Sequence, residues 1–255
     1  MTQAFVVGWP IAHSRSPLIH RFWLGRYGID GDYVAEPVPP DEIAAFFAGG
    51  FAAKGYVGGN VTLPHKEAAF RAAAVTTPMA KKLEAANTLW LEGSRLHADN
   101  TDVHGFLANL DERAPAWRSG GTALVIGAGG ASRAVLQALI DAGFGSVALL
   151  NRTVARAEAL AAADLIVNAT SAELHGGEGL VIPWHVARER AIATDLVYVP
   201  LVTPFLEGAR QRGLTIIDGL GMLLHQAVPG FERWFGVRPT VDDELRALVV
   251  ADLER

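Results

Sequence analysis

The stretch over residues 122–134 constrains the fold of this chain more than any other. It reads TALVIGAGGASRA, so an apolar run meets a glycine-rich turn, and a helical pattern follows. A strand, a tight glycine turn and a helix form the first unit of a dinucleotide-binding fold. Gly127 permits the turn, while Gly129 and Gly130 lack a Cβ atom that would block a pyrophosphate. Because the turn reads G-x-G-G-A and not the full G-x-G-x-x-G pattern, an ordinary glycine turn in an α/β protein stays open as an alternative.

Composition narrows the classes of protein to which the chain can belong. Half of the 255 residues are hydrophobic, 19% are charged, and the formal net charge is -5. An acidic balance disfavours nucleic acid and anionic membranes as partners, because both select basic surfaces. The absence of cysteine excludes disulfides, thiolate metal sites and cysteine nucleophiles, and it fits a reducing cytoplasm. The histidines have no metal-ligand spacing, and glycines and charges interrupt the apolar segments, so we expect no metal site and no membrane span.

Strand and helix signals alternate along the chain and predict an α/β fold in two domains. We assign residues 1–101 and 238–255 to the first domain and residues 102–237 to the second. The helices predicted at 102–113 and 219–235 would bridge the two. We expect the last helix, predicted over residues 242–253, to dock on the N-terminal domain.

Lys66 is the first candidate for chemistry. In the segment NVTLPHKEAAF, a helix predicted to begin at Pro64 has Lys66 in its first turn. A cation there opposes the positive end of the helix dipole, at a cost of about 0.3–1 kcal/mol. A local rule broken without visible compensation indicates a functional site, although a solvated surface lysine is equally compatible with this segment alone.

Other polar residues stand at strand ends and helix starts, where α/β folds commonly bind ligands. Asp102 lies at a helix start, where an acid is also favourable on electrostatic grounds alone. Ser14 and Ser16 lie in HSRSP, and turn or N-cap roles would explain them as well. The strand-end candidates are Asn60, Thr62 and Asn87.

Arg152 predicts the choice of cofactor. It follows the second strand of the nucleotide domain, where an acid would bind the ribose of NAD, and Arg156 lies one helical turn further on. Two guanidinium groups there suit a 2′-phosphate and hence NADP. A solvated, charged helix face is the alternative.

Taken together, the motifs resemble the shikimate dehydrogenase family. Nearly the whole chain carries them, in the family's order: GWPIAHSRSP, GGNVTLPHK, ANT, DNTD, GAGGASRA, NRTVAR, NATS, DLVYVPLVTP and DGLGMLLHQAVPGFERWFG. The resemblance implies an α/β substrate domain and a Rossmann-like, doubly wound NADP domain. It also implies reversible NADPH-dependent reduction of 3-dehydroshikimate to shikimate in aromatic amino-acid biosynthesis.

The resemblance also implies a role for individual residues. Lys66 would be the catalytic acid/base and Asp102 its partner, in a cleft between the domains. The substrate-binding residues would be Ser14, Ser16, Thr62, Lys66, Asn87, Asp102, Tyr198 and Gln226. The NADP-binding residues would be Gly127, Ala128, Gly129, Gly130, Ala131, Asn151, Arg152, Thr153, Arg156, Leu196 and Gly219. The serine and tyrosine hydroxyls would donate to the ring carboxylate, for which Arg15 is a further candidate.

The sequence departs from the family in three places. Glu173 follows NATS, where the family usually has a glycine-methionine pair, and Thr77-Pro78 stands where a family acid often contacts the cofactor. Most seriously, only residues 153–163 separate the strand at 147–150 from the next strand, at 165–169, so one βα unit is missing. A helix of this length rises roughly 16 Å, barely enough to run back along a strand.

The short connection predicts the order of the strands. We expect five parallel strands in the order 2-1-4-5-6 of the family's numbering, with the strand at 147–150 at the edge. A right-handed crossover then places the connecting helix on the face opposite the helix at 131–141. Alternatively, a segment is absent from the sequence, and the chain would be broken between residues 159 and 164.

Two rival functions remain. A quinate or quinate/shikimate dehydrogenase differs by one hydroxyl in its ligand, but those relatives often prefer NAD and have an acid near position 152 or 153. A nicotinamide-binding regulatory relative without turnover is opposed by the presence of Lys66 and Asp102, whereas Glu173 and the shortened segment leave it open. The sequence leaves the oligomeric state undecided, a homodimer included.

Overall fold

The computed structural model describes residues 1–150, 157–170 and 180–255 and divides the chain into two compact units. Unit 1 comprises Met1–Thr101 and Gln226–Arg255, and unit 2 comprises Asp102–His225. The second boundary lies inside helix α10 (Leu220–Phe235), whereas the sequence placed it at 238. Among the described residues, no helix is both long enough and apolar enough to cross a membrane.

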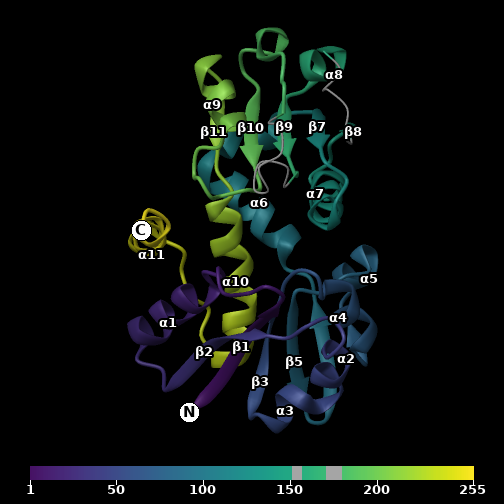
Figure 1. The fold of residues 1–255 in the computed structure, drawn as a ribbon. Helices are drawn as coiled ribbons and strands as arrows, with labels where there is room; N and C mark the ends of the chain where they lie inside the picture. Colours follow the sequence, from purple (N-terminus) through teal and green to yellow (C-terminus); the bar gives the residue numbers. More distant parts are fainter. Residues whose placement is uncertain (151–156, 171–179) are drawn as a thin grey trace. The chain divides into compact units, whose positions relative to one another are not determined.

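Unit 1 is built on a mixed six-stranded sheet in the order β2-β1-β3-β5-β6-β4 (Figure 1). β1 pairs in parallel with β2 and β3, whereas β3 with β5 and β5 with β6 are antiparallel. The strand patterns on either side of residues 92–94 predict a hairpin, which β5 and β6 form, while the two-residue β4 is too short for a sequence pattern to reveal. The strands are β1 (Thr2–Gly8), β2 (Gly31–Pro37), β3 (Tyr56–Val61), β4 (Val75–Thr76), β5 (Thr88–Glu92) and β6 (Arg95–Asp99).

The helices of unit 1 differ from the sequence prediction in their starts. Helix α4 (Lys66–Ala72) begins at Lys66 and not at Pro64, and His65 is its N-cap. Likewise Arg15, not Ser16, is the N-cap of α1 (Ser16–Tyr27). Helix α11 (Asp243–Leu253) contacts α1, which confirms its predicted docking. Helix α5 (Pro78–Leu83), which the sequence did not predict, follows β4, and Thr77 is its N-cap.

The apolar pattern of Ile43, Phe46 and Phe47 after Pro40 predicts a single helix, but the structure has three short pieces. They are α2 (Ile43–Ala45), the π-helical turn η1 (Phe46–Gly50) and α3 (Phe51–Ala53). Gly49 has a φ of 133°, so the α-helical hydrogen-bond ladder cannot continue through it. The aromatic residues of this segment still reach the core, where Phe46 and Phe51 pack against Phe5.

His20 lies in an aromatic cluster at the centre of unit 1. Its ring stacks on Tyr33, with ring centroids 3.9 Å apart, and Trp23 and Phe231 also pack against it. The side chain is 0% exposed. Burial penalises the charged imidazolium and lowers the pKa of His20 from 6.5 to about 3.

The buried histidine makes stability depend on pH. Between pH 6.5 and pH 3 the unfolded chain binds a proton at His20 that the folded chain does not, so the stabilisation is complete above pH 6.5 and is lost on acidification. We expect the free energy of unfolding to fall by about 2 kcal/mol between pH 8 and pH 5 through this group. Urea unfolding at both pH values measures the fall, and His20→Phe should reduce it. Equal pH dependence in both proteins would contradict the assignment.

Unit 2 has a five-stranded parallel sheet in the order β11-β10-β9-β7-β8 (Figure 1). This confirms the predicted order, with β8 at the edge. The apolar pattern over residues 192–199 predicts a strand up to residue 199, but β10 ends at Asp195. The strands are β7 (Thr122–Ile126), β8 (Ser146–Leu150), β9 (Leu165–Asn168), β10 (Ile192–Asp195) and β11 (Thr215–Ile217).

The short connection between β8 and β9 ends in helix α8 (Ala157–Ala162). Hydrogen bonds from Ala163 N to Leu160 O and from Asp164 N to Thr122 O lead the chain from α8 into β9, as the five-stranded sheet requires. Leu160 packs with Leu124 and Ile126, which point to one face of β7. The described members of that cluster include none from α7 (Gly130–Asp141), as expected for helices on opposite faces.

The remaining helices of unit 2 cover the sheet and lead into it. They are α6 (Asp102–Arg113), the 3₁₀ turns η2 (Pro115–Ser119) and η4 (Trp184–Val186), and α9 (Pro204–Gln211). Phe205 and Leu206 of α9 join the cluster around Leu124, so α9 lies on the same face as α8.

Candidate functional site

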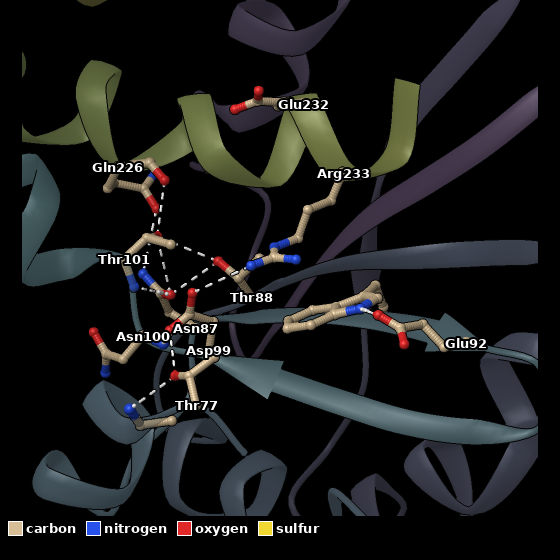
Figure 2. Close-up of polar contacts among 12 residues, drawn as sticks. Thr77, Asn87, Thr88, Glu92, Asp99, Asn100, Thr101, Gln226, Glu232 and Arg233 are labelled. Atoms are coloured by element: carbon tan, nitrogen blue, oxygen red, sulfur yellow. Dashed lines mark hydrogen bonds and ion pairs between the residues drawn. The ribbon is translucent and has the colours of Figure 1, made fainter. Parts of the chain in front are cut away.

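The polar centre of unit 1 is the side chain of Asn87, which is 2% exposed (Figure 2). Its Oδ1 accepts hydrogen bonds from Thr101 N (2.8 Å) and from the hydroxyl of Thr88 (3.0 Å), and Thr101 Oγ1 lies 3.1 Å away. Its Nδ2 donates to Gln226 Oε1 at 3.4 Å. These partners fix the orientation of the amide, and they bring together two predicted substrate ligands, Asn87 and Gln226.

Thr101 ties this network to α10. Its hydroxyl lies 2.8 Å from the main-chain oxygen of Gln226. A hydroxyl has one proton, so donation to Gln226 leaves Thr88 as the hydroxyl donor to Asn87. Thr101 is 3% exposed and directly precedes Asp102 in the chain. Thr101 is part of the DNTD motif, but the sequence alone indicates no role for it.

Asn60 supports Asn87 from the neighbouring strand. Its Nδ2 donates to the main-chain oxygen of Asn87 (3.1 Å) and lies 3.3 Å from Thr88 Oγ1, while its Oδ1 accepts from the hydroxyl of Tyr33 (2.6 Å). With 4% exposure and both ends of its amide engaged inside the protein, Asn60 acts as a support for Asn87. The sequence pattern alone treated it as a ligand candidate.

Lys66 and Thr62 lie at the same edge of the sheet. The main-chain oxygen of Lys66 accepts from Ala86 N at 2.9 Å, so the start of α4 is bonded to the residue before Asn87. Thr62 N donates to Val7 O, and its own oxygen accepts from His65 N. Both side chains are half-buried. The first residue of α4 is thus fixed beside the Asn87 network.

Ser14 and Ser16 are held together at the start of α1. Ser16 N donates to Ser14 Oγ at 3.3 Å, and Ser14 N donates to Ile11 O. Between them, Arg15 donates to His13 O and forms an ion pair with Asp252, with 2.5 Å between Nε and Oδ2. The contact with Asp252 is an ion pair without hydrogen-bond geometry at Nε, and together with the His13 bond it gives the guanidinium partners inside unit 1.

Asp102 is the first residue of α6 and is 8% exposed. An acid in the first turn interacts favourably with the helix dipole. A buried carboxylate is nevertheless costly unless it has partners, so its burial needs more than the helix to explain it.

The glycine turn of unit 2 fits a dinucleotide. Gly127 has a φ of 107°, and a Cβ there would lie 2.8 Å from the main chain of Ala169, so only glycine fits. A Cβ at Gly129 or Gly130 would meet no atom of the described residues within 4 Å. Residues 128–131 are exposed, and Gly129, as N-cap of α7, supplies no side-chain hydrogen bond. Main-chain N–H groups at this helix start can therefore receive a pyrophosphate.

Asn168 and Asp195, two buried polar residues that the sequence patterns did not single out, stabilise the ends of β9 and β10. Asp195 accepts from Asn168 Nδ2 (3.0 Å), Thr203 Oγ1 (2.7 Å) and Val197 N (2.9 Å), and burial raises the pKa of its carboxyl. Polar residues that end apolar strands, in NATS and DLVY, were the available signal.

Of the other predicted cofactor residues, Leu196 and Gly219 are described by the structure. A Cβ on Gly219 would lie 2.4 Å from Leu196 O, so these two are adjacent. Tyr198, a predicted substrate ligand, is half-buried in the segment after β10. Asn151, Arg152, Thr153, Arg156 and Glu173 lie outside the described residues.

Comparison with known proteins gives consistent matches along the chain. Residues 6–89 match the family model described as the shikimate dehydrogenase substrate binding domain. Residues 112–175 match shikimate / quinate 5-dehydrogenase, and residues 219–246 match the shikimate 5'-dehydrogenase C-terminal domain.

Individual proteins match over nearly their whole length. Shikimate dehydrogenase (NADP(+)) from Azorhizobium caulinodans is 53% identical, over 99% of this chain and 97% of the relative. The protein of that name from Mesorhizobium japonicum is 54% identical, over 98% and 96%. The crystal structure of shikimate 5-dehydrogenase from Thermus thermophilus, in complex with NADP(H) and shikimate, superposes with a TM-score of 0.87 at 35% identity, covering 99% and 100%. The Azorhizobium alignment spans 274 positions, more than the 255 residues here, so that relative has residues that this chain lacks.

Proposed function

The chain belongs to the shikimate dehydrogenase family, and from this premise we propose that Lys66 and Asp102 carry out its reaction. The enzyme is an NADP-dependent oxidoreductase of the shikimate pathway, which interconverts 3-dehydroshikimate and shikimate. NADPH, when bound, supplies the hydride for the C3 ketone. The glycine turn at Gly127 and the open start of α7 suit its pyrophosphate.

In the proposed mechanism, Lys66 gives a proton to the alkoxide that develops at C3. Asp102 orients the neighbouring ring hydroxyl and the lysine ammonium. The hydroxyls of Ser14, Ser16 and Tyr198 donate to the ring carboxylate, while Thr62, Asn87 and Gln226 hold the other ring substituents. Positioning and charge stabilisation then supply most of the rate acceleration.

The observation that carries this proposal is the hydrogen-bond network of Asn87. Thr101, which precedes Asp102, donates to Asn87 Oδ1, and Ala86, which precedes Asn87, donates to the main chain of Lys66. Asn87 is thus connected through its side chain to the residue before Asp102, and through its own chain neighbour to the main chain of Lys66. Such support from a surrounding shell is what an accurate active site requires.

Steady-state kinetics with shikimate and NADP⁺ tests the proposal. Turnover that is efficient with shikimate and weak with quinate is the expected result. Comparable turnover of quinate would favour the quinate/shikimate enzyme. Tight binding of NADP⁺ without turnover would instead favour a regulatory relative.

The arginines after β8 are proposed to select NADP over NAD. Replacing Arg152 and Arg156 with alanine should raise the KM for NADP⁺ about 10–100-fold and the KM for NAD⁺ far less, because only NADP⁺ carries a 2′-phosphate. KM values for both cofactors measure this. Arg210→Ala, which removes an exposed arginine of α9 paired with Glu207, is the control and should change neither. Equal use of both cofactors by the unaltered enzyme would refute the role of these arginines.

A homodimer and a cytoplasmic location also stay predictions. Analytical ultracentrifugation of the purified protein decides the first of them.

A further inference from the structure

Helices α1 and α11 are tied together at both ends by ion pairs. At one end, Arg26 in the last turn of α1 contacts Asp242 Oδ2 and Glu244 Oε2, at 2.5 and 2.6 Å. At the other end, Arg15 pairs with Asp252, in the last turn of α11. The N-terminus of one helix therefore faces the C-terminus of the other. The loop that carries Ser14 and Ser16, the serine loop, lies at the Arg15 end.

The two sets of ion pairs differ in whether their charges suit the helix dipoles. Arg26 lies at the C-terminal end of α1, and Asp242 and Glu244 lie at the N-terminal end of α11, so each charge suits the dipole of its own helix. Arg15 is a cation at the start of α1, and Asp252 is an acid at the end of α11. Both oppose their own helix dipoles, so helix electrostatics does not account for either residue.

The position of Arg15 connects the ion pair to the two serines. It lies between Ser14 and Ser16, whose atoms are joined by the bond from Ser16 N to Ser14 Oγ. A movement of the Arg15 main chain would therefore move both serines. Arg15 and Asp252 are 27% and 33% exposed, so solvent screens their attraction only in part.

We propose that Asp252 is a positioning residue, which holds Arg15 and thereby fixes Ser14 and Ser16 for the substrate carboxylate. The proposal rests on the role proposed above for the two serines. Asp252 also keeps the guanidinium away from the carboxylate that the loop receives. Carboxylate recognition then falls to the hydroxyls, and the C-terminal helix becomes part of the support of the substrate site.

The test compares Asp252→Asn with Glu244→Gln. Each converts a carboxylate of α11 that faces an arginine of α1 into an amide, but only the first touches the serine loop. We expect Asp252→Asn to raise the KM for shikimate about three- to tenfold, with kcat and the KM for NADP⁺ within about twofold of the unaltered enzyme. Glu244→Gln should leave all three unchanged, and Asp252→Glu should restore the KM.

A double-mutant cycle distinguishes a tether from a direct ligand. If Arg15 acts through Asp252, the Arg15→Gln and Asp252→Asn double variant should have a KM no higher than the worse single variant. If Arg15 itself bound the carboxylate, Asp252→Asn would free the guanidinium and leave the KM unchanged or lower, which overturns the proposal. A parallel loss of kcat and of NADP⁺ affinity overturns it too, because it would signal general loosening. Absence of shikimate turnover in the unaltered enzyme would contradict the proposed function instead.

Discussion

Replacing Lys66 with alanine is expected to lower kcat by about 10²–10⁴ while shikimate binding stays largely intact. A general acid acts chiefly in the transition state, so its loss affects kcat far more than ground-state binding. The hydrogen bond from Ala86 N to residue 66 uses the main-chain oxygen and survives the substitution, so the Asn87 network should persist. Steady-state kinetics gives kcat, and calorimetric titration with shikimate gives the dissociation constant.

Two further variants separate proton transfer from charge. Lys66→Arg keeps the cation but holds its proton too firmly to give it up, so kcat should stay low. Lys81→Ala removes an exposed lysine from the last turn of α5 and should leave kcat unchanged. An unaltered kcat in Lys66→Ala would contradict the role of Lys66 as the acid/base.

The strand order of unit 2 was predictable because covalent geometry leaves few alternatives. Residues 153–163 are too few for a further strand and helix, and a right-handed crossover of that length must pass over β7. The glycine turn was predictable for a similar reason, since the positive φ at Gly127 and the closeness of Ala169 admit no side chain. Steric limits of this kind depend on a short segment of chain, so they can be recognised in the sequence.

Features that depend on distant partners were not predictable in the same way. Asn60 became a support for Asn87 only through the hydroxyl of Tyr33, which lies on another strand. The pair of Arg15 and Asp252 joins residues at opposite ends of the chain. A strand-end or turn pattern is the same whether its polar group faces a ligand or a protein partner, so only the packing distinguishes the two.

Asp102→Asn is expected to lower kcat about as severely as Lys66→Ala, by about 10²–10⁴. Asp102 lies at the start of α6, where an acid is favourable for the helix alone, so the catalytic and structural roles predict different results. Loss of the helix interaction costs about 0.3–1 kcal/mol of stability and leaves kcat unchanged. If the charge of Asp102 orients Lys66 as proposed, its loss lowers kcat and leaves the fold intact, because asparagine has nearly the same shape.

Asp243 is a control for the helix interaction alone, since it is the first residue of α11 as Asp102 is of α6, but it is exposed. Asp243→Asn should cost about 0.3–1 kcal/mol of stability in urea unfolding, the helix contribution, without affecting kcat. The double variant Lys66→Ala with Asp102→Asn should be no slower than Lys66→Ala alone, because residues that act as a unit lose their effect together. Additive losses in kcat would show that Asp102 acts independently of the lysine, most simply on the ring hydroxyl.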